Sequence, residues 1–386
     1  MRATQCRSCG SENLTLVYDF GPQPLAGQFP LVPESQETAK KFPLDLTQCD
    51  DCALLQVTNL PPLEEIFHAD YRYSSSTVPD LVRHFDEYAG VIEELLEPTA
   101  KVLEFGCNDG VLLDKLTRRG FACVGVDASD NVADLAREKG LDVRSGFFSP
   151  DLVEAEGLTG TFDLVTCSNV FAHIHDVGSA VIAAKQALRD GGLFAIEVHD
   201  GRILIEEAQF DTIYHEHLTY FTASTISRLL ARYGFDIVRI DNIPMHGGGI
   251  RCISRLTTSD SLPAQPVQRD ELVAEDRFSG TIERCAAQSE ELRDSYGKVD
   301  GYGAAGRSQM FVNMVGGGDA FRQVFDDSSF RQGRYIVGTD VPINPYTGQS
   351  GSCCVILAWN YAPTIADKLR GKYEKIVTLL PEYREW

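Results

Sequence analysis

The segment KVLEFGCNDGVLLDKLTRRGF, residues 101–121, decides the fold of this chain. It predicts a short buried strand, a glycine-bearing turn and a helix, and the next stretch, ACVGVDAS, predicts a second strand that ends near Asp127. This layout is one half of a Rossmann-type fold. Gly106 and Gly110 would let the backbone approach a ligand closely, and a carboxylate at the tip of the second strand can accept both hydroxyls of a ribose. The segment therefore predicts a nucleoside site.

The spacing of the glycines in this turn indicates which kind of nucleoside binds there. GxNDG is not the GxGxxG spacing that cradles a dinucleotide pyrophosphate. Downstream, FDLVTCSNVFAHI predicts a fourth strand, a helix runs through Leu188, and DGGLFAIEVH predicts a fifth strand, an order typical of S-adenosylmethionine-dependent methyltransferases. The alternative is a Rossmann-like domain without a cofactor. Because ligands bind beyond the carboxyl ends of such strands, we expect these residues to line the cofactor: Glu104, Gly106, Asn108, Asp109, Gly110, Asp127, Ser168 and Asn169.

The N-terminal region carries two CxxC knuckles, CRSC with Cys6 and Cys9 and CDDC with Cys49 and Cys52. Four thiolates on two tight turns predict a tetrahedral zinc site. Such a set leaves no open position for water, so the metal would hold a small module together and perform no catalysis. Four unrelated thiols or a redox pair are the alternatives. The remaining cysteines lie in apolar or helical contexts and are predicted to be reduced core thiols.

Length and charge limit the classes of partner. A chain of 386 residues suggests two or three domains, and its formal net charge of -21 argues against a nucleic-acid backbone as partner. No long apolar run predicts a membrane span, and the first residues do not resemble a secretory signal. We therefore expect a cytoplasmic monomer that binds a small molecule and neither nucleic acid nor membrane.

A second glycine-rich turn follows a polar link near Arg255 and a charged helix expected over residues 269–295. In KVDGYGAAGRSQMFVNMV three glycines spell GxGxxG between a strand and a helix, and Asp326 and Asp327 lie about twenty residues further on. That pattern fits a nicotinamide dinucleotide. Arg307 at the start of the helix suits any diphosphate, so a nucleotide sugar fits equally well. The tail, VILAWNYAPTIADKL and KIVTLLP, predicts two more strands and a helix.

The stretch IYHEHLTYF, residues 213–221, could be a metal site, a proton-transfer site or ordinary packing. The metal interpretation fails on spacing, because His215 and His217 are two residues apart whereas a helical zinc site needs histidines four apart. A histidine titrates near neutral pH, so His217 is the candidate base. Glu216 or another carboxylate could orient it, and Tyr214 could donate to a developing enolate. Packing is the remaining alternative, and His215 is expected to be incidental.

Eight segments in order carry a resemblance that covers nearly the whole chain: CRSC…CDDC, DYRYSSS, EFGCNDGVLL, SNVFAHI, FDTIYHEHLTYF, MHGGGIRC, GYGAAGR and FDDSSFRQGRYIVGTDVPI. The sequence resembles the sugar C-methyltransferases that act on nucleotide-linked 4-keto-6-deoxyhexoses in branched deoxysugar biosynthesis, of which the tetronitrose C-3' methyltransferase is one. The resemblance implies a structural zinc, S-adenosylmethionine in the middle domain, and a sugar nucleotide between the middle and C-terminal domains. The positions that match the family's catalytic residues are Tyr71, His173, Tyr214, Glu216 and His217.

Together these observations predict an α/β chain in three parts. Residues 1–68 would form a zinc-binding module, residues 69–255 a Rossmann-like methyltransferase domain, and residues 256–386 a Rossmann-like domain on the sugar-nucleotide side. The expected reaction removes a proton from a carbon, C3, next to the ketone of a thymidine-diphosphate 4-keto-deoxysugar, with His217 as base, and methylates the enolate, in antibiotic-type biosynthesis. Contacts to the substrate are expected from Glu197, His246, Gly247, Gly303 and Arg307.

Two departures from the family keep other functions open. This chain has EVHDG, with His199 and Asp200, where relatives usually place a proline soon after the glutamate, and Arg307 replaces the usual lysine. An arginine offers a planar fork in place of a point charge, so diphosphate contacts would differ. The alternatives are an O- or N-methyltransferase with the same cofactor fold, a nicotinamide-dependent sugar reductase built on GYGAAG, and a non-catalytic sugar-nucleotide-binding protein.

Overall fold

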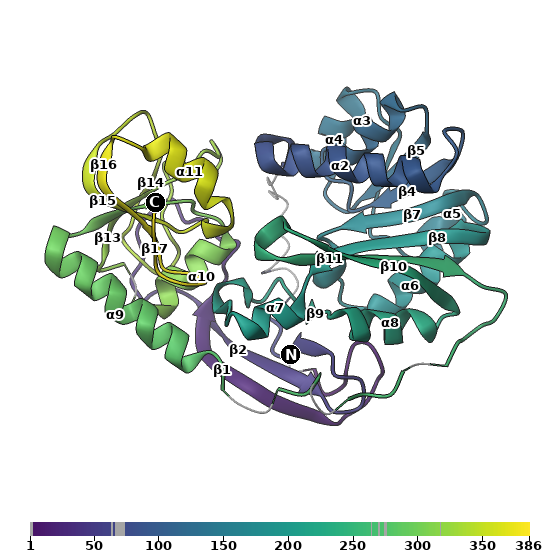
Figure 1. Cartoon of the computed structure of the whole chain (residues 1–386), viewed down its shortest axis with the longest axis horizontal. Coiled ribbons are helices and arrows are strands. Elements are labelled where there is room, and N and C mark those ends of the chain that lie inside the picture. Colours follow the sequence, from purple (N-terminus) through teal and green to yellow (C-terminus); the bar gives the residue numbers. More distant parts are fainter. Residues whose placement is uncertain are drawn as a thin grey trace.

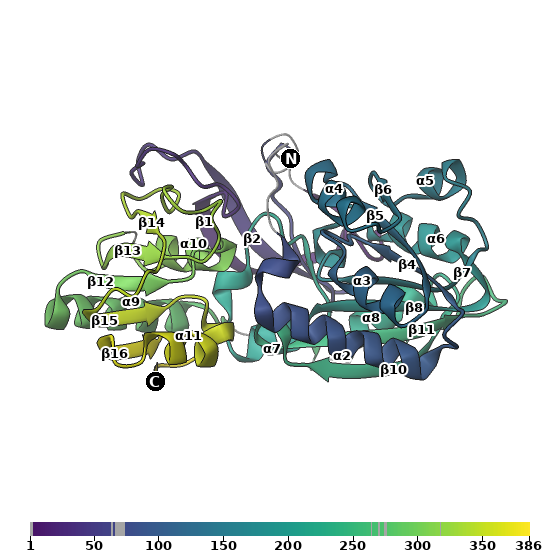
Figure 2. The same cartoon turned by 90° about the horizontal axis from the view of Figure 1, so that it is seen from above.

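The computed structural model describes residues 3–62, 65, 74–263, 265–268, 271–273, 276–316 and 318–386. Three sheets organise these residues, and Figure 1 shows them as two lobes with the first two strands passing below and between the lobes. The view turned by 90° in Figure 2 shows the same separation, with β1 and β2 again between the lobes. No helix among the described residues is long and apolar enough to cross a membrane.

The N-terminal sheet has four strands in the order β1-β2-β3-β9, all paired antiparallel. Its last strand comes from a distant part of the chain, because Tyr220 pairs with Leu55. Its apolar side chains, such as Leu44 and Leu46, belong to a core that also contains Phe311 of the C-terminal lobe. The strands are β1 (Leu14–Pro24), β2 (Lys41–Cys49), β3 (Leu55–Val57) and β9 (Thr219–Tyr220).

The central sheet has seven strands in the order β10-β11-β8-β7-β4-β5-β6. Strands β4 to β8 are parallel, and the antiparallel hairpin β10-β11 joins at β8. Strand order reverses between β4 and β7, the point at which open α/β sheets bind ligands. The strands are β4 (Lys101–Phe105), β5 (Ala122–Asp127), β6 (Val143–Ser145), β7 (Phe162–Ser168), β8 (Leu188–His199), β10 (Phe235–Ile243) and β11 (Gly249–Leu256).

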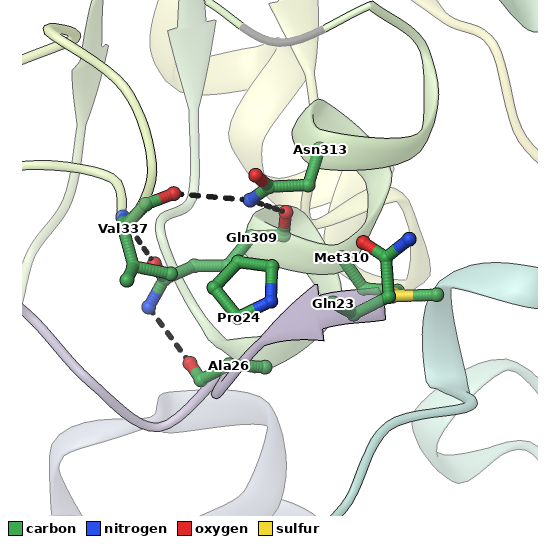
Figure 3. Close-up of a pocket in the computed structure, with 7 residues that line it drawn as sticks. All are labelled: Gln23, Pro24, Ala26, Gln309, Met310, Asn313 and Val337. Carbon is green, nitrogen blue, oxygen red and sulfur yellow. Dashed lines mark hydrogen bonds between the residues drawn. The ribbon is translucent and has the colours of Figure 1, made fainter. Parts of the chain in front are cut away.

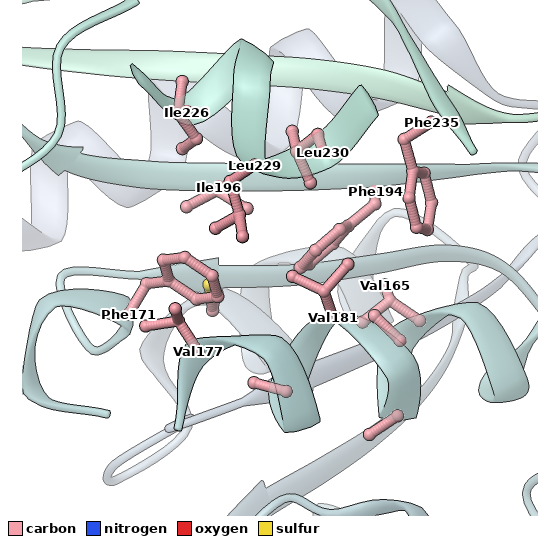
Figure 4. Close-up of a cluster of buried hydrophobic side chains, with 14 of the residues drawn as sticks. Val165, Phe171, Val177, Val181, Phe194, Ile196, Ile226, Leu229, Leu230 and Phe235 are labelled. Carbon is pink, nitrogen blue, oxygen red and sulfur yellow. The ribbon is translucent and has the colours of Figure 1, made fainter. Parts of the chain in front are cut away.

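Helices cover both faces of the central sheet. Figure 4 shows one face, where Phe171, Phe194 and Phe235 pack among aliphatic side chains of two helices, α6 and α8. Burying each such ring stabilises the fold by about 1.5–3 kcal/mol. The helices of this lobe are α2 (Pro79–Leu95), α3 (Val111–Arg118), α4 (Asp130–Glu138), α5 (Pro150–Ala155), α6 (Val177–Ala187), α7 (Gly201–Glu206) and α8 (Ala223–Ala231), with single turns η1 (Ser75–Thr77), η2 (Phe171–His173), η3 (Phe210–Thr212) and η4 (Met245–Gly247).

The C-terminal sheet has six strands in the order β14-β13-β12-β15-β16-β17, parallel except for β17. Its first connection, β12 to α10 to β13, repeats the Rossmann pattern of the central lobe. Its elements are α9 (Ser279–Tyr296), β12 (Val299–Tyr302), α10 (Gly306–Met314), β13 (Phe321–Phe325), β14 (Ile343–Asn344), β15 (Gly351–Ile356), η6 (Trp359–Tyr361), α11 (Ala362–Leu369), β16 (Tyr373–Thr378) and β17 (Arg384–Glu385).

The predicted fold class is confirmed, with a cysteine-bearing module, a central Rossmann-like domain and a second α/β unit. One helix differs from its expected extent, because it begins at Ser279 and not near residue 269. The carboxylate of Asp276 accepts hydrogen bonds from the backbone N–H groups of Phe278 and Ser279, which fixes the start of the helix there. The predicted boundaries between the three parts stay a prediction.

Candidate active site

The four knuckle cysteines form one cluster. The sulfur atoms of Cys6, Cys9, Cys49 and Cys52 all lie within 4.8 Å of one another, and the Cys6–Cys52 and Cys9–Cys49 pairs are 3.5 Å apart. A tetrahedral zinc with Zn–S bonds of about 2.3 Å requires sulfurs about 3.8 Å apart, so the donor set fits this metal. Among the described residues this is the one group of histidine, cysteine or carboxylate side chains close enough to hold a metal. Four thiolates close the coordination sphere, which makes the site structural.

The first turn of the central lobe holds Asp127 ready to accept hydrogen bonds. One carboxylate oxygen accepts from the N–H of Asn108 at 2.8 Å and the other from the N–H of Ser129 at 2.9 Å. A carboxylate has about four acceptor positions, so two remain for the hydroxyls of a ribose. Burial raises the pKa of Asp127, and the two N–H groups oppose that rise. This arrangement fits the nucleoside of S-adenosylmethionine.

A second acid at the same edge lacks a partner. Glu104 is 2% exposed, and one of its carboxylate oxygens has no hydrogen-bond partner among the described residues. Burial and the nearby Asp127, Glu197 and Asp109 carboxylates hold the pKa of Glu104 well above its ordinary range. The hydroxyl of Ser168 is likewise buried without a partner. A ligand that carries an ammonium group, as the methionine part of S-adenosylmethionine does, would satisfy such an acid.

Other residues predicted to line the cofactor have structural roles. The carboxylate of Asp109 accepts from the hydroxyl of Ser74 at 2.7 Å and pairs with Lys139 at 3.3 Å. Gly106 and Gly110 both have positive φ, and a Cβ on either would overlap side chains of Val170 or Leu141. Packing within the protein therefore also excludes a side chain at these two positions, and their contact with the cofactor stays a prediction.

The stretch singled out in the sequence places His217 and Tyr214 together. The hydroxyl of Tyr214 lies 2.9 Å from Nε2 of His217, and Nδ1 of His217 lies 2.7 Å from the carbonyl oxygen of Thr212. A carbonyl only accepts, so Nδ1 carries the proton and Nε2 has the free lone pair. Burial, together with the neighbouring His173, holds the pKa of His217 well below its ordinary range, so the ring is neutral.

Glu216 does not orient His217, because the carbonyl of Thr212 does. The carboxylate of Glu216 instead receives a hydrogen bond from the backbone of Gly27 in the N-terminal module, and burial raises its pKa to about 7. A Cβ on Gly27 would overlap this carboxylate. His173 packs edge-on against His217 with ring centroids 4.8 Å apart. Burial lowers the pKa of His173, against the backbone groups of Glu216 and Asn169.

The loop that holds Glu216 is itself held by the C-terminal lobe. Figure 3 shows Gln309 of α10 donating to the carbonyl of Ala26 and accepting from the N–H of Val337. Gln309 also donates to the carbonyl of Gln28 at 2.9 Å, and its side chain is fully buried. The start of α10 reaches the site as well, because a Cβ on Gly306 would lie 3.2 Å from the ring of Tyr214. All three sheets therefore contribute to one site.

Arg307, predicted to bind a diphosphate, joins the two lobes. Its guanidinium makes two hydrogen bonds of 2.9 Å to the carboxylate of Asp211 and one of 2.6 Å to the carbonyl of His246. It also stacks on Trp359, whose indole N–H donates to Asp211 at 2.9 Å. A Cβ on Gly247 would overlap the same indole ring. We call this group, Arg307 with Asp211, His246, Gly247 and Trp359, the interlobe clasp.

Glu197, another predicted substrate contact, is engaged within the protein. Its carboxylate lies 2.9 Å from Nε2 of His84 and pairs with Arg251 at 2.6 Å, and the group is fully buried. Gly303 has positive φ, and a Cβ there would overlap Ala358. These residues therefore have partners within the protein, and their contact with a substrate stays a prediction.

The second glycine-rich turn lies between β12 and α10, as predicted. Asp326, at the position where dinucleotide folds hold a ribose, accepts from the N–H of Ala304 at 2.6 Å and of Ser328 at 2.8 Å. It also pairs with Arg331 at 3.2 Å. Because of these partners, the carboxylate of Asp326 has fewer acceptor positions left for a ligand than the carboxylate of Asp127. The geometry gives a nicotinamide cofactor no specific support.

Comparisons with known proteins decide the family. C-methyltransferase NovU of Streptomyces niveus is 30% identical over an alignment of 406 positions, and the alignment covers 98% of this chain and 96% of that protein. This chain is a C-methyltransferase family member. Models for a methyltransferase domain, a proposed zinc binding domain and a C-methyltransferase C-terminal domain match residues 82–240, 6–67 and 244–381. The C-methyltransferase resemblance is confirmed, as are the enzyme class and the two cofactors, S-adenosylmethionine and structural zinc.

Further similar proteins cover half of this C-methyltransferase or less. A ubiquinone biosynthesis O-methyltransferase of Acinetobacter baylyi is 29% identical over 129 residues, 32% of this chain and 52% of that protein. Among solved structures, the PH0226 protein of Pyrococcus horikoshii OT3 has a TM-score of 0.42 at 16% identity, over 50% of this chain and all of that one. Magnesium protoporphyrin IX methyltransferase of Synechocystis, with S-adenosylmethionine bound, has a TM-score of 0.36 at 16% identity. The match covers 46% of this chain and 79% of that one.

Several contributors to the site escaped the sequence analysis. Thr212 acts through its backbone carbonyl, which no side-chain pattern reveals, and Gly27 acts through its N–H from the turn that follows β1. Asp211, a lone acid between apolar residues in FDTI, was the one sign in the sequence that this segment contributes to the site. Tyr71, predicted to be catalytic, lies outside the described residues.

Proposed function

We propose that this C-methyltransferase methylates the carbon, C3, next to the ketone of a thymidine-diphosphate 4-keto-deoxysugar. The observation that carries the proposal is the paired placement of Nε2 of His217 and the hydroxyl of Tyr214 at 2.9 Å. A neutral imidazole beside a phenol suits removal of a proton next to a ketone and stabilisation of the enolate oxygen. In a protein that methylates carbon, enolisation is the step that makes carbon nucleophilic.

The geometry suggests a separate role in enolisation for each of the two side chains. The hydroxyl of Tyr214 points at Nε2 of His217, so a bound ketone would draw the phenolic O–H away to its own oxygen. That movement frees Nε2 to take the proton from C3. Thr212 accepts from Nδ1 throughout and so stabilises the imidazolium as it forms.

Bound S-adenosylmethionine supplies the electrophilic methyl group that the enolate carbon takes. The C3–H bond would break and its proton would move to Nε2 of His217. The carbon–carbon bond would form as the sulfur–methyl bond breaks, with S-adenosylhomocysteine as the leaving group, and the ketone would return. His217 then releases the proton to solvent. Because burial and neighbouring positive groups disfavour the charged ring, the imidazolium loses its proton readily.

The diphosphate is proposed to lie near the N-terminus of α10, whose first turn has no side-chain cap and adjoins Tyr214. This position leaves the interlobe clasp intact. The product would be a methyl-branched deoxysugar of the antibiotic type, made by a cytoplasmic monomer.

The test is hydrogen exchange without methylation. With thymidine-diphosphate 4-keto-6-deoxyglucose and S-adenosylhomocysteine in deuterated water, the wild-type protein should exchange the hydrogen on the attacked carbon. His217→Asn should slow both this exchange and methylation by roughly 10²–10⁴-fold, because a general base acts on the barrier. Nε2 of His215 lies 3.1 Å from the carbonyl of Pro43, away from this pair, so His215→Asn is the matched control and should keep exchange near the wild-type rate.

Two outcomes would redirect the proposal. Exchange at the wild-type rate in His217→Asn would move the base elsewhere, to His173 first. Methylation without any carbon-bound exchange would favour an O-methyltransferase, the activity named for a relative that covers about a third of this chain.

A further inference from the structure

His199 lies at the carboxyl end of β8, the edge of the central sheet where ligands bind. It is one of the positions where this chain departs from the family pattern. Its Nε2 lies 2.8 Å from Oε1 of Gln209. The proposed base is held by the same segment, because Gln209 comes just before the turn η3, and the carbonyl of Thr212 at the end of that turn accepts from Nδ1 of His217. A substrate held at His217 would therefore come near His199.

The protonation of the His199 ring follows from its partner. The side-chain NH2 group of Gln209 donates to the carbonyl of Gly247 at 2.9 Å and to the carboxylate of Glu207 at 2.7 Å. Both of these are acceptors, so the orientation of the amide is fixed and Oε1 is the atom that faces His199. Oε1 only accepts. Nε2 of His199 therefore carries the proton, and Nδ1 has a free lone pair.

That lone pair has no partner. Nδ1 of His199 is shielded from solvent and has no hydrogen bond to any described residue. Nδ1 is not protonated at neutral pH either, because burial and the nearby Arg307 charge lower the pKa of His199 to about 3. A buried polar atom without a partner calls for an explanation, and a ligand group that completes its hydrogen bond is one. The ring thus presents a fixed acceptor and no competing donor on that side.

We infer that Nδ1 of His199 accepts a hydrogen bond from a hydroxyl or amino group of the acceptor substrate and selects substrates that carry this group. The inference rests on the proposed function, since it places the substrate between His217 and β8. A site built around an unpaired acceptor discriminates strongly against an analogue that lacks the donor. His199 is then a specificity residue that touches substrate without taking part in proton transfer.

Two substitutions separate the ring nitrogens. The side-chain oxygen of asparagine can occupy the position of Nδ1, whereas the amide of glutamine reaches the position of Nε2. The probes are thymidine-diphosphate 4-keto-6-deoxyglucose and its 2-deoxy and 3-deoxy counterparts, compared by kcat/KM for methylation. Wild type and His199→Asn should prefer thymidine-diphosphate 4-keto-6-deoxyglucose over one of its two deoxy counterparts by on the order of tenfold or more, and His199→Gln should lose most of that preference.

The outcomes are distinguishable. If wild type methylates none of the probes, the proposed function fails and this inference with it. If wild type methylates them but His199→Gln keeps the full preference, the inference alone is overturned, and an ordered water at Nδ1 is the explanation. Calorimetric binding of S-adenosylhomocysteine reports whether each variant is folded.

A measurement on the wild-type protein does not depend on the variants. With histidine labelled by ¹⁵N, the signal of the unprotonated nitrogen of His199 should move to lower frequency when the preferred probe binds with S-adenosylhomocysteine. The matching deoxy probe should leave it in place. Equal shifts with both probes, or none with either, would overturn the inference.

Discussion

The carboxyl group of Glu216 links this site to the pH dependence of folding. Burial raises its pKa from 4.5 to about 7 in the folded protein. The folded state then binds more protons than the unfolded state between these values, so the stabilisation is complete below about pH 4.5 and is lost as the pH rises through about 7. Stability from this group therefore falls with rising pH.

Replacing Glu216 by glutamine should remove that dependence. We expect the loss of unfolding free energy between pH 5 and pH 8 to be smaller in Glu216→Gln than in wild type by about 1–3 kcal/mol. Urea denaturation at the two pH values measures it. Glu138→Gln, on the exposed side of α4, is the control and should match wild type. Identical pH dependence in Glu216→Gln and wild type would show that Glu216 is ionised in the folded state at neutral pH.

Asp127 gives a second prediction at the scale of one residue. Its carboxylate has acceptor positions left after the bonds from Asn108 and Ser129, so Asp127→Ala should weaken S-adenosylmethionine binding by roughly ten- to a hundredfold. Isothermal calorimetry measures the affinity, and thymidine diphosphate should bind within a few-fold of wild type. Unchanged cofactor affinity would contradict the placement of the ribose.

The residues that the sequence revealed share one property. Cys6, Asp127 and His217 belong to short local patterns whose chemistry is visible in a few adjacent letters. Gly27 acts through its backbone N–H and Gln309 through its side-chain amide, each on a partner far away in the sequence, and no local pattern records such a contact. Local patterns therefore located the site, whereas its supports needed the fold.

At the scale of elements, the loop of residues 25–28 is the support that a small change would disturb most. It lies between the carboxylate of Glu216 and the side chain of Gln309. Gly27→Ala would push its new methyl group into Glu216, so we expect kcat to fall by about tenfold or more while S-adenosylmethionine binding stays within a few-fold. Steady-state kinetics and calorimetry measure the two effects.

A matched pair of variants identifies the cause. Gly280→Ala, at a helical position with open space around it, should keep wild-type kinetics. Combining Gly27→Ala with Glu216→Asp shortens the carboxylate and should recover part of the kcat lost in Gly27→Ala. If the double variant is no better than Gly27→Ala alone, overlap with Glu216 is not the reason for the loss.

Long periodic elements were predictable and short ones were not. The strand, turn and helix of residues 101–121 and the helix Pro79–Leu95 follow apolar periodicity, which is a local signal. The two-residue strand β9 has too few residues to show any period, and it exists because β3 offers it an edge. The carboxylate of Asp276 accepts from the N–H groups of Phe278 and Ser279 at the start of α9, and the charged sequence around it gives no sign of this contact.

For the whole molecule, the interlobe clasp determines how firmly the C-terminal lobe docks. Arg307→Lys keeps the charge but loses the two parallel hydrogen bonds to Asp211 and the flat stacking on Trp359. We expect the unfolding free energy to fall by about 1–3 kcal/mol and amide exchange to rise around residues 209–212 and 305–309. Denaturation and hydrogen-exchange mass spectrometry measure these changes.

An exposed arginine provides the comparison for the clasp. Arg293 pairs with Asp294 at the surface, so Arg293→Lys should change stability by less than about 0.5 kcal/mol. Equal effects from Arg307→Lys and Arg293→Lys would show that the clasp adds nothing beyond an ordinary surface pair.

The pairing of β3 with β9 also sets an order of events during synthesis. The knuckles and β1 to β3 lie within residues 6–57, so metal can bind and three strands can pair soon after they leave the ribosome. The outer edge of β3 must then wait for residues 219–220, which at about 5–20 residues per second arrive roughly 10–30 s later. During that interval the nascent chain carries an open strand edge, a template for mispairing with other chains. Slowing translation between the two segments should therefore increase aggregation of this protein in cells, and a chaperone that covers strand edges should reduce it.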